Sequence, residues 1–238
     1  MTGARARVRA ELTREIADVA RRHLATDGAA ALSLRAVARE LGMASSAVYR
    51  YFPSRDDLLT TLIVDAYDAL GDAAERADAA LPPDDLRGRW HAVCRAVREW
   101  ALAHPHEYAL VYGSPVPGYA APETTIAPAA RVGEVLCAIV ARGVDAGLVD
   151  PGSGGTDATL HPGIAERMGL GDRPDGSLGA RAILAWSSIV GMVGFELFGH
   201  TNNVVDEHAE YYEAATAALA DLVGLPEGNV HSGPAGRP

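Results

Sequence analysis

The side chains best suited to directional bonding lie in one short stretch, between residues 33 and 55. Ser45, Ser46 and Ala47 are small and follow a glycine-containing turn, and Arg50 comes about one helical turn later. An arginine guanidinium can donate two parallel hydrogen bonds to the acceptor edge of guanine. Hydroxyl groups can bond to base edges or to phosphates. This combination indicates a surface that contacts nucleic acid.

Two short helices joined by a turn would position these groups. The first is expected over residues 34–41 and ends at Gly42. The second is expected over residues 46–52 and ends before a proline, which disfavours helical backbone in the preceding residue. Val48 and Phe52 are four residues apart and would face inward, which leaves the polar residues between them facing outward. This arrangement is typical of a helix-turn-helix.

Longer helices are expected on both sides of this pair. Apolar side chains recur along one face of a first helix that stops near Gly28: Val8, Leu12, Ile16, Val19 and Leu24. Ser54 and Asp57 form a variant of the capping box, which would open a long helix to about Ala80.

Charge is divided unevenly along the chain. Residues 1–55 hold ten arginines and five acidic residues, a net +5, whereas residues 56–238 hold eleven arginines and 26 acidic residues, a net −15. The whole chain has a formal net charge of −10 at pH 7. A basic N-terminal part would attract phosphates, and an acidic remainder would repel them.

The stretch from Leu32 to Leu59 resembles the DNA-binding domain of the TetR family of repressors. The family pattern is a hydrophobic turn, Leu-Tyr-x-His/Tyr-Phe, a short linker, a basic residue and acidic-Leu-Leu. This sequence supplies them in order as Val48-Tyr49-Arg50-Tyr51-Phe52, Pro53-Ser54, Arg55 and Asp57-Leu58-Leu59. The likeness covers about residues 8–62.

The resemblance implies double-stranded operator DNA as the partner, with Arg55 on a phosphate. It implies base or phosphate contacts by the following residues: Arg35, Ser45, Ser46, Ala47, Tyr49, Arg50 and Tyr51. Helix N-termini at Ser33 and Ser54 would present backbone amides suited to phosphates. Ala47 stands where the family often has Thr or Gly, and Tyr51 where it often has His, so the operator sequence stays open.

Residues 55–225 are expected to form a larger helical domain for ligand binding and dimerisation. The segments Tyr112–Tyr119 and Ala185–Gly191 resemble, more weakly, a TetR subclass with a Trp-His-Gly signature, in which Val190 here replaces the His. The resemblance implies a homodimer through the last two long helices, expected at about residues 178–199 and 206–223. The first of these is apolar on most sides, as a helix covered by two subunits must be.

An unidentified small-molecule effector is the second expected partner. Six aromatic side chains are candidates to line its pocket, with ordinary core packing as the alternative for each: Trp90, Trp100, Tyr108, Tyr112, Tyr119 and Trp186.

Other classes of site find little support. His91 and Cys94, three residues apart, with His104 and His106 nearby, do not complete a metal-ligand set. Catalytic and phosphate-binding motifs are not found, so we expect no enzyme activity, no cofactor and no metal. The two cysteines indicate reduced core thiols. No unbroken apolar run supports a membrane span, and a cytoplasmic location is expected.

Together these patterns predict an all-α protein with a helix-turn-helix domain over residues 1–54, a ligand and dimerisation domain over 55–225, and a disordered tail over 226–238. Residues 150–163 are expected to form a mobile loop. The leading hypothesis is a repressor that a ligand releases from a palindromic operator. A ligand-independent regulator or activator with the same helix-turn-helix is the alternative, and an enzyme on a helical fold is the least supported class.

Overall fold

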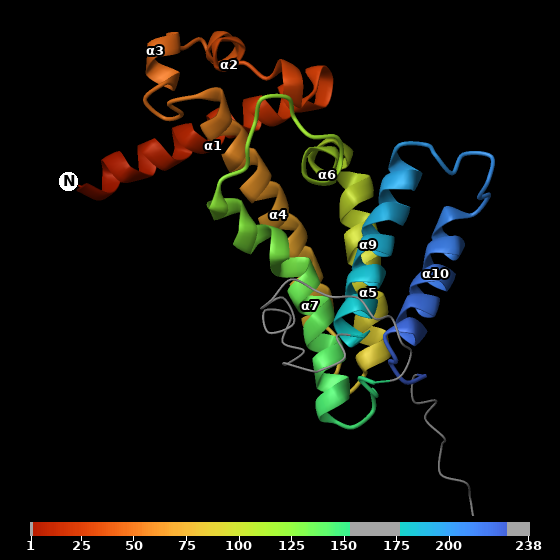
Figure 1. Cartoon of the computed structure of the whole chain (residues 1–238). Coiled ribbons are helices and arrows are strands. Elements are labelled where there is room, and N and C mark those ends of the chain that lie inside the picture. Colours follow the sequence, from red (N-terminus) through yellow and green to blue (C-terminus); the bar gives the residue numbers. More distant parts are fainter. Residues whose placement is uncertain (1, 153–176, 228–238) are drawn as a thin grey trace, which may run out of the picture. The chain divides into compact units, whose positions relative to one another are not determined.

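The computed structural model describes residues 2–152 and 177–227, and every regular element in these ranges is a helix (Figure 1). The predicted all-α class is therefore confirmed. In chain order the elements are α1 (Thr2–Asp27), η1 (Ala29–Ala31), α2 (Leu34–Glu40), α3 (Ser45–Val48), α4 (Arg55–Ala79), α5 (Leu86–Ala103), α6 (Pro105–Tyr112), η2 (Glu123–Thr125), α7 (Ile126–Asp145), α9 (Ser177–Leu197) and α10 (His208–Leu222).

The described chain divides into two compact units. The head unit comprises the residues up to Ala69 together with His104–Ala129, and the body unit comprises Leu70–Ala103 and the residues from Ala130 onward. The division falls later than the boundary expected after residue 54, because the first turns of α4 share a core with α1, α2 and α3. The boundary expected after residue 54 stays a prediction.

The head unit is built around one apolar core, to which α1, α2, α3 and α4 all contribute. Its members include Ile16, Val19, Val37, Val48, Phe52, Leu58, Leu59 and Leu62. Val48 and Phe52 are 0% and 4% exposed, as their spacing predicted. Val8 differs from the expectation, because it is 54% exposed. It lies on the first turns of α1, which begin before the residues that form the core.

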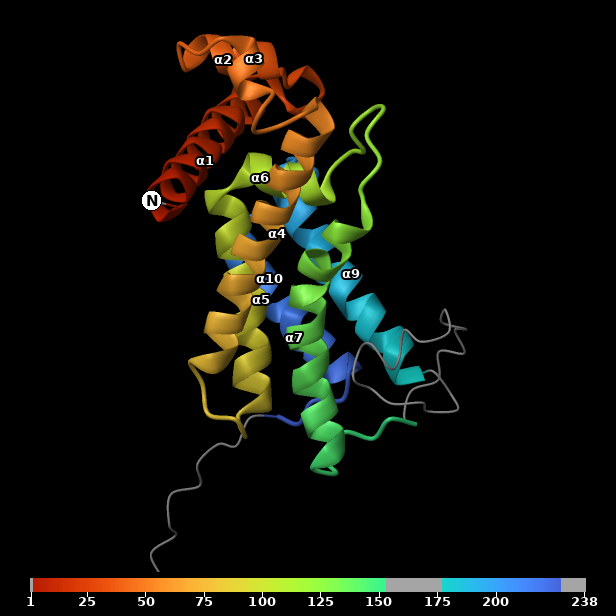
Figure 2. The same cartoon turned by 90° about the vertical axis from the view of Figure 1, so that its left-hand side faces the viewer.

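Within the head unit, the turn that contains Gly42 places α2 and α3 next to each other (Figures 1 and 2). Gly42 adopts φ +63, a left-handed conformation that costs glycine little and most other residues more. After Pro53, the amide of Asp57 donates to Ser54 Oγ over 3.1 Å, and Ser54 Oγ donates to Asp57 Oδ2 over 2.6 Å. These bonds start α4 where the capping pattern predicted.

In the body unit, α5, α9 and α10 pack against one another. Trp90 is 2% exposed, and its indole Nε1 donates to the carbonyl of Thr216 over 3.0 Å. The hydroxyl of Tyr212 donates to the carbonyl of Cys94 over 2.9 Å. Both bonds use polar atoms of buried aromatic side chains, and they fix α10 against α5.

Two segments, Glu123–Asp145 and Ser177–Leu197, have the length and apolar composition of a membrane-spanning helix, a test that core helices of soluble proteins also pass. The predicted mobile loop at 150–163 and the predicted tail at 226–238 lie mostly outside the described residues.

Candidate nucleic-acid interface

The second helix of the predicted helix-turn-helix, expected over residues 46–52, is shorter in the structure, and we call residues 45–52 the reading segment. α3 is α-helical from Ser45 to Val48, and the chain continues to Phe52 through hydrogen-bonded turns. The amides of Tyr51 and Phe52 donate to the carbonyl of Val48 over 2.9 Å and 3.1 Å. Because Val48 and Phe52 are buried, these turns hold the residues between them at the surface.

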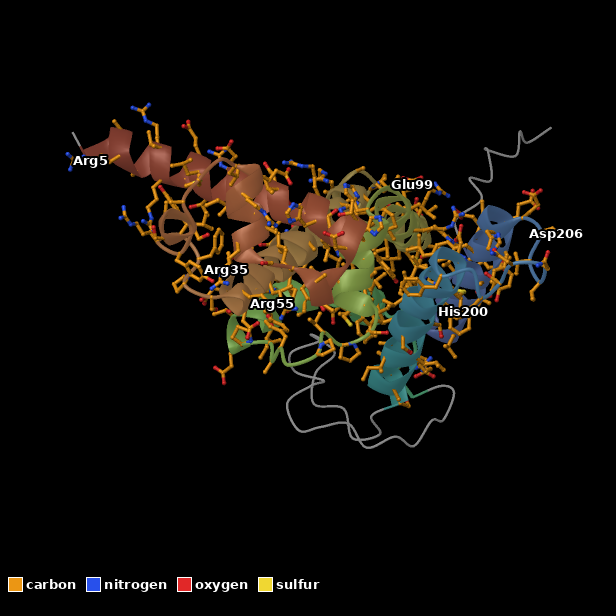
Figure 3. All side chains as sticks on the ribbon, turned by 90° about the horizontal axis from the view of Figure 1, so that it is seen from above. Arg5, Arg35, Arg55, Glu99, His200 and Asp206 are labelled. Atoms are coloured by element: carbon orange, nitrogen blue, oxygen red, sulfur yellow. The ribbon has the colours of Figure 1, made fainter. Side chains whose placement is uncertain are left out.

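The predicted DNA-contacting side chains differ in exposure. Four are exposed: Arg35, Ser46, Tyr49 and Arg50. The remaining five are half-buried: Ser33, Ser45, Ala47, Tyr51 and Arg55. Figure 3 shows Arg35 and Arg55 among the side chains of the head unit. The exposed group holds two arginines and a phenol, which suits contact with bases and phosphates.

Ser33 occupies the N-cap position of α2 with extended backbone, φ −140 and ψ 119. Its carbonyl accepts the first helical hydrogen bond, from the amide of Val37 over 3.0 Å, whereas its hydroxyl makes no capping bond. The hydroxyl is therefore not committed to the helix end. Contact between Ser33 and a phosphate stays a prediction.

Arg9, on α1, contacts the end of the reading segment and holds it in place. Its Nη2 donates to the carbonyl of Arg50 over 3.2 Å, and its guanidinium carbon lies 5.2 Å from the ring centroid of Tyr51. A guanidinium over an aromatic face is attracted to the ring electrons. Sequence spacing did not reveal this role, since the two segments are 41 residues apart.

Arg55 donates hydrogen bonds to backbone carbonyls that its neighbours in the sequence do not predict. Its Nη2 donates to the carbonyl of Ala29 over 2.8 Å, and its Nε donates to the carbonyl of Leu32 over 3.2 Å. The guanidinium thus ties the start of α4 to the segment that precedes α2. A phosphate contact by Arg55 stays a prediction, and it would add to these bonds or compete with them.

Ion pairing in the head unit leaves its predicted interface positive. Glu40 accepts from Arg22 over 2.7 Å and contacts His23 Nε2 at 2.6 Å, and the hydrogen bond from Arg22 is the main cause that lowers the pKa of Glu40. Other arginines form no ion pair with any residue in the described ranges: Arg5, Arg7, Arg9, Arg14, Arg35, Arg39 and Arg50. Such uncompensated cations attract phosphates.

The six predicted ligand-lining residues divide between the two units. Trp90, Trp100 and Trp186 belong to the body unit, whereas the three tyrosines belong to the head unit because α6 and the loop after it do. Contact of these six residues with an effector stays a prediction.

Within the head unit, the predicted tyrosines have packing roles. The rings of Tyr108 and Tyr112 have centroids 5.0 Å apart, and Tyr67, which the sequence analysis did not single out, lies edge-on to Tyr112 at 5.9 Å. Burial raises the pKa of each of these phenols. The hydroxyl of Tyr119 is hydrogen-bonded to Thr60 Oγ1 at 2.9 Å.

No group of three or more metal-binding side chains occurs among residues 2–152 and 177–227. Both cysteines are buried, and burial raises the pKa of the Cys137 thiol to about 12 and raises that of Cys94 as well. These thiols are protonated at neutral pH and are poor nucleophiles.

Comparison with known families gives two matches. Residues 16–62 match the family described as bacterial regulatory proteins, tetR family. Residues 90–219 match the family described as tetracyclin repressor-like, C-terminal domain.

Individual relatives cover nearly the whole chain. The HTH-type transcriptional regulator Rv1816 of Mycobacterium tuberculosis is 41% identical over 230 residues, which are 93% of this chain and 96% of that protein. The solved structure of the regulatory protein SCO4313 is 35% identical, with a TM-score of 0.71, covering 91% of this chain and 98% of that one. RolR, solved in complex with resorcinol, is 15% identical, with a TM-score of 0.52, covering 93% of this chain and 97% of that one, and shares the fold.

Proposed function

The chain belongs to the TetR family of DNA-binding transcriptional regulators, and we propose that it is a repressor that a small molecule releases from a palindromic operator. The observation that carries DNA recognition is the exposed set Ser46, Tyr49 and Arg50 on a buried Val48–Phe52 framework, flanked by arginines without ion-pair partners among the described residues. In this proposal Arg50 reads a base, and Arg35, Ser33 and Arg55 contact phosphates.

The repressor acts as a homodimer in this proposal, and α9 and α10 form its interface. These helices and the turn between them expose large apolar side chains that a monomer would leave in water: Ile183, Leu184, Phe195, Phe198 and Tyr211. Large exposed apolar groups on neighbouring elements mark protein interaction sites. A two-fold symmetric dimer presents two reading segments and so matches a palindrome.

The effector is a small, largely apolar molecule held in the body unit. RolR shows that a protein with this fold can hold an aromatic molecule such as resorcinol. Among the aromatic candidates, Trp90, Trp100 and Trp186 are the ones that the body unit contains. The regulator works in the cytoplasm, where its DNA is, and needs neither a cofactor nor catalysis.

Release follows from a population shift. An effector that binds better to a dimer with differently spaced reading segments lowers operator affinity by its differential affinity for the two forms. Successive major grooves on one face of DNA lie about 34–36 Å apart, which sets the spacing that binding needs. In this proposal α4 transmits the change between the effector site and the reading segment, since it contributes residues to both units.

The first test is selection of random duplex DNA on the purified protein, with its mass in solution measured alongside. A palindromic motif bound by a dimer is the expected result. Small aromatic compounds are then screened for loss of operator binding. A ligand-independent regulator with the same helix-turn-helix would select a motif equally well, but none of the compounds would change its affinity. No enriched motif from a folded protein would overturn the proposal.

A further inference from the structure

The match to the DNA-binding family begins at residue 16, so the first turns of α1 lie before it. We call residues 3–10 the arm. The arm holds three arginines, Arg5, Arg7 and Arg9, and no acidic residue, and all of its residues are exposed. Figure 3 shows Arg5 near the N-terminal end of this helix. Because all of its residues are exposed, the arm contributes no side chain to the core of the head unit.

One face of the arm borders the reading segment. Ala4, Arg5, Val8 and Arg9 line a shallow hollow together with Tyr51. Arg9 fixes this hollow through its bond to the Arg50 carbonyl and its position over the Tyr51 ring. The hollow is therefore continuous with residues that the proposed function places on DNA.

The chemistry of this hollow suits a sugar-phosphate backbone. Arg5 and Arg9 are four residues apart, so both lie on the hollow's side of the helix, separated by about 6 Å along its axis. Neither forms an ion pair with a described residue, and Val8, 54% exposed, offers an apolar surface between them. Two cations around an apolar patch complement phosphates joined by deoxyribose.

We propose that the arm binds the DNA backbone flanking each half-site, with Arg5 and Arg9 as the groups that contact phosphates. This inference rests on the proposed function, because it requires the reading segment to lie on DNA. The arm adds affinity that does not depend on base sequence, and it lengthens the bound site beyond the bases that α3 reaches.

The test compares Arg5→Ala with Arg7→Ala in the full-length protein, using the duplex that the wild type itself selects. Arg7 is the matched control, because it lies about 200° around the helix from Arg5 and so faces away from the hollow. Each duplex is made in two lengths, as the palindrome alone and with flanking base pairs on both sides. Dissociation constants are measured across salt concentrations, and helix content is compared by circular dichroism.

The expected result is specific to Arg5 and to the flanked duplex. Removing one phosphate-binding cation from each subunit should reduce the slope of log K against log salt by about 1.8 per dimer. Arg5→Ala should also reduce the affinity that the flanks add, leaving the share that Arg9 supplies, whereas Arg5→Lys should retain it and Arg7→Ala should match the wild type.

Two results would overturn the inference. One is a salt slope and a flank effect in Arg5→Ala that equal those of the wild type. The other is an equal loss of affinity in Arg5→Ala and Arg7→Ala, which would mean that the arm attracts DNA only through its overall charge. Either leaves the proposed function intact, provided that the wild type selects a motif. Failure of the wild type to select one would count against the proposed function itself.

Discussion

Glu196 of α9 accepts two hydrogen bonds from Arg98 of α5, over 2.6 Å from Nη2 and over 2.8 Å from Nε. The two side chains are only 15% and 17% exposed, so the pair is largely removed from water. The two residues are 98 positions apart in the sequence, so helical spacing does not predict the pair. The ring centroid of His200, four residues after Glu196, lies 5.3 Å from that of Phe195.

Arg98→Met should destabilise the body unit, because it leaves the Glu196 carboxylate with little solvent and no cation. The expected loss is about 2–3 kcal/mol of unfolding free energy, measured by urea titration at pH 7. The matched control is Arg95→Met, since Arg95 and Glu213 form an exposed pair, 54% and 41% exposed. That variant should lose less than about 1 kcal/mol. The double variant Arg98→Met with Glu196→Met should recover much of the loss, and equal losses in the two single variants would contradict this account.

Stability should fall as the pH drops below about 6.5, in part because of His91. Burial is the main cause that lowers the pKa of His91 from its ordinary value of 6.5. Between the folded and unfolded pKa values the unfolded chain binds more protons, so acid favours unfolding there and the contribution returns as the pH rises. His91→Gln should flatten the dependence of unfolding free energy on pH in this window. Identical slopes for the two proteins would show that the imidazole stays as accessible to protons as in the unfolded chain.

The helix-turn-helix was predictable because its signals are local. Gly42 ends one helix, Pro53 ends the next segment, and the spacing of Val48 and Phe52 specifies the buried face. Each of these depends on neighbours a few residues away. The all-α class follows from the same kind of signal, repeated along the chain.

The partners of distant segments were not predictable from periodicity, which gives the buried face of a helix but not what covers it. The loop after α6 joins the head unit through Tyr119 and Thr60, which are 59 residues apart. Arg55 was expected on a phosphate, yet its carbonyl partners lie 23 to 26 residues earlier in the chain. Such contacts depend on how the helices pack, which periodicity does not give, so the six ligand-lining candidates stay a prediction.

Arg50→Ala should relax base preference at one position of each half-site. A bidentate contact between arginine and guanine is worth about 1–3 kcal/mol of discrimination. The backbone carbonyl of Arg50 holds Arg9 and survives the substitution, so the arm should keep its position. Repeating the duplex selection with the variant checks this. If the variant selects an unchanged motif with lower affinity, Arg50 contacts a phosphate and not a base.

Arg55→Ala should weaken binding to all sequences about equally, and it should flatten the salt dependence by about one counterion for each phosphate that the arginine no longer neutralises. The same substitution removes the bonds to the carbonyls of Ala29 and Leu32, so the head unit should also lose stability. Hydrogen exchange of the amides in α2 separates the two effects. Faster exchange with an unchanged salt slope would make Arg55 a positioning residue, whereas a flattened slope with unchanged exchange would assign it to phosphate.

If α9 and α10 form the dimer interface as proposed, Phe195→Asp should give a monomer, because it places a carboxylate in that face. Phe195 is 56% exposed in the single chain, so the substitution costs the isolated fold little. In a dimer the carboxylate would be buried without a partner, which is expensive. Leu102→Asp is the matched control, since Leu102 is an apolar residue of α5 that is 41% exposed. Light scattering should show a monomer for Phe195→Asp and a dimer for Leu102→Asp, and only the former should lose its preference for a palindrome over a single half-site. A Phe195→Asp protein that remains a dimer would exclude this face of α9 from the interface and move the search to the other exposed apolar side chains.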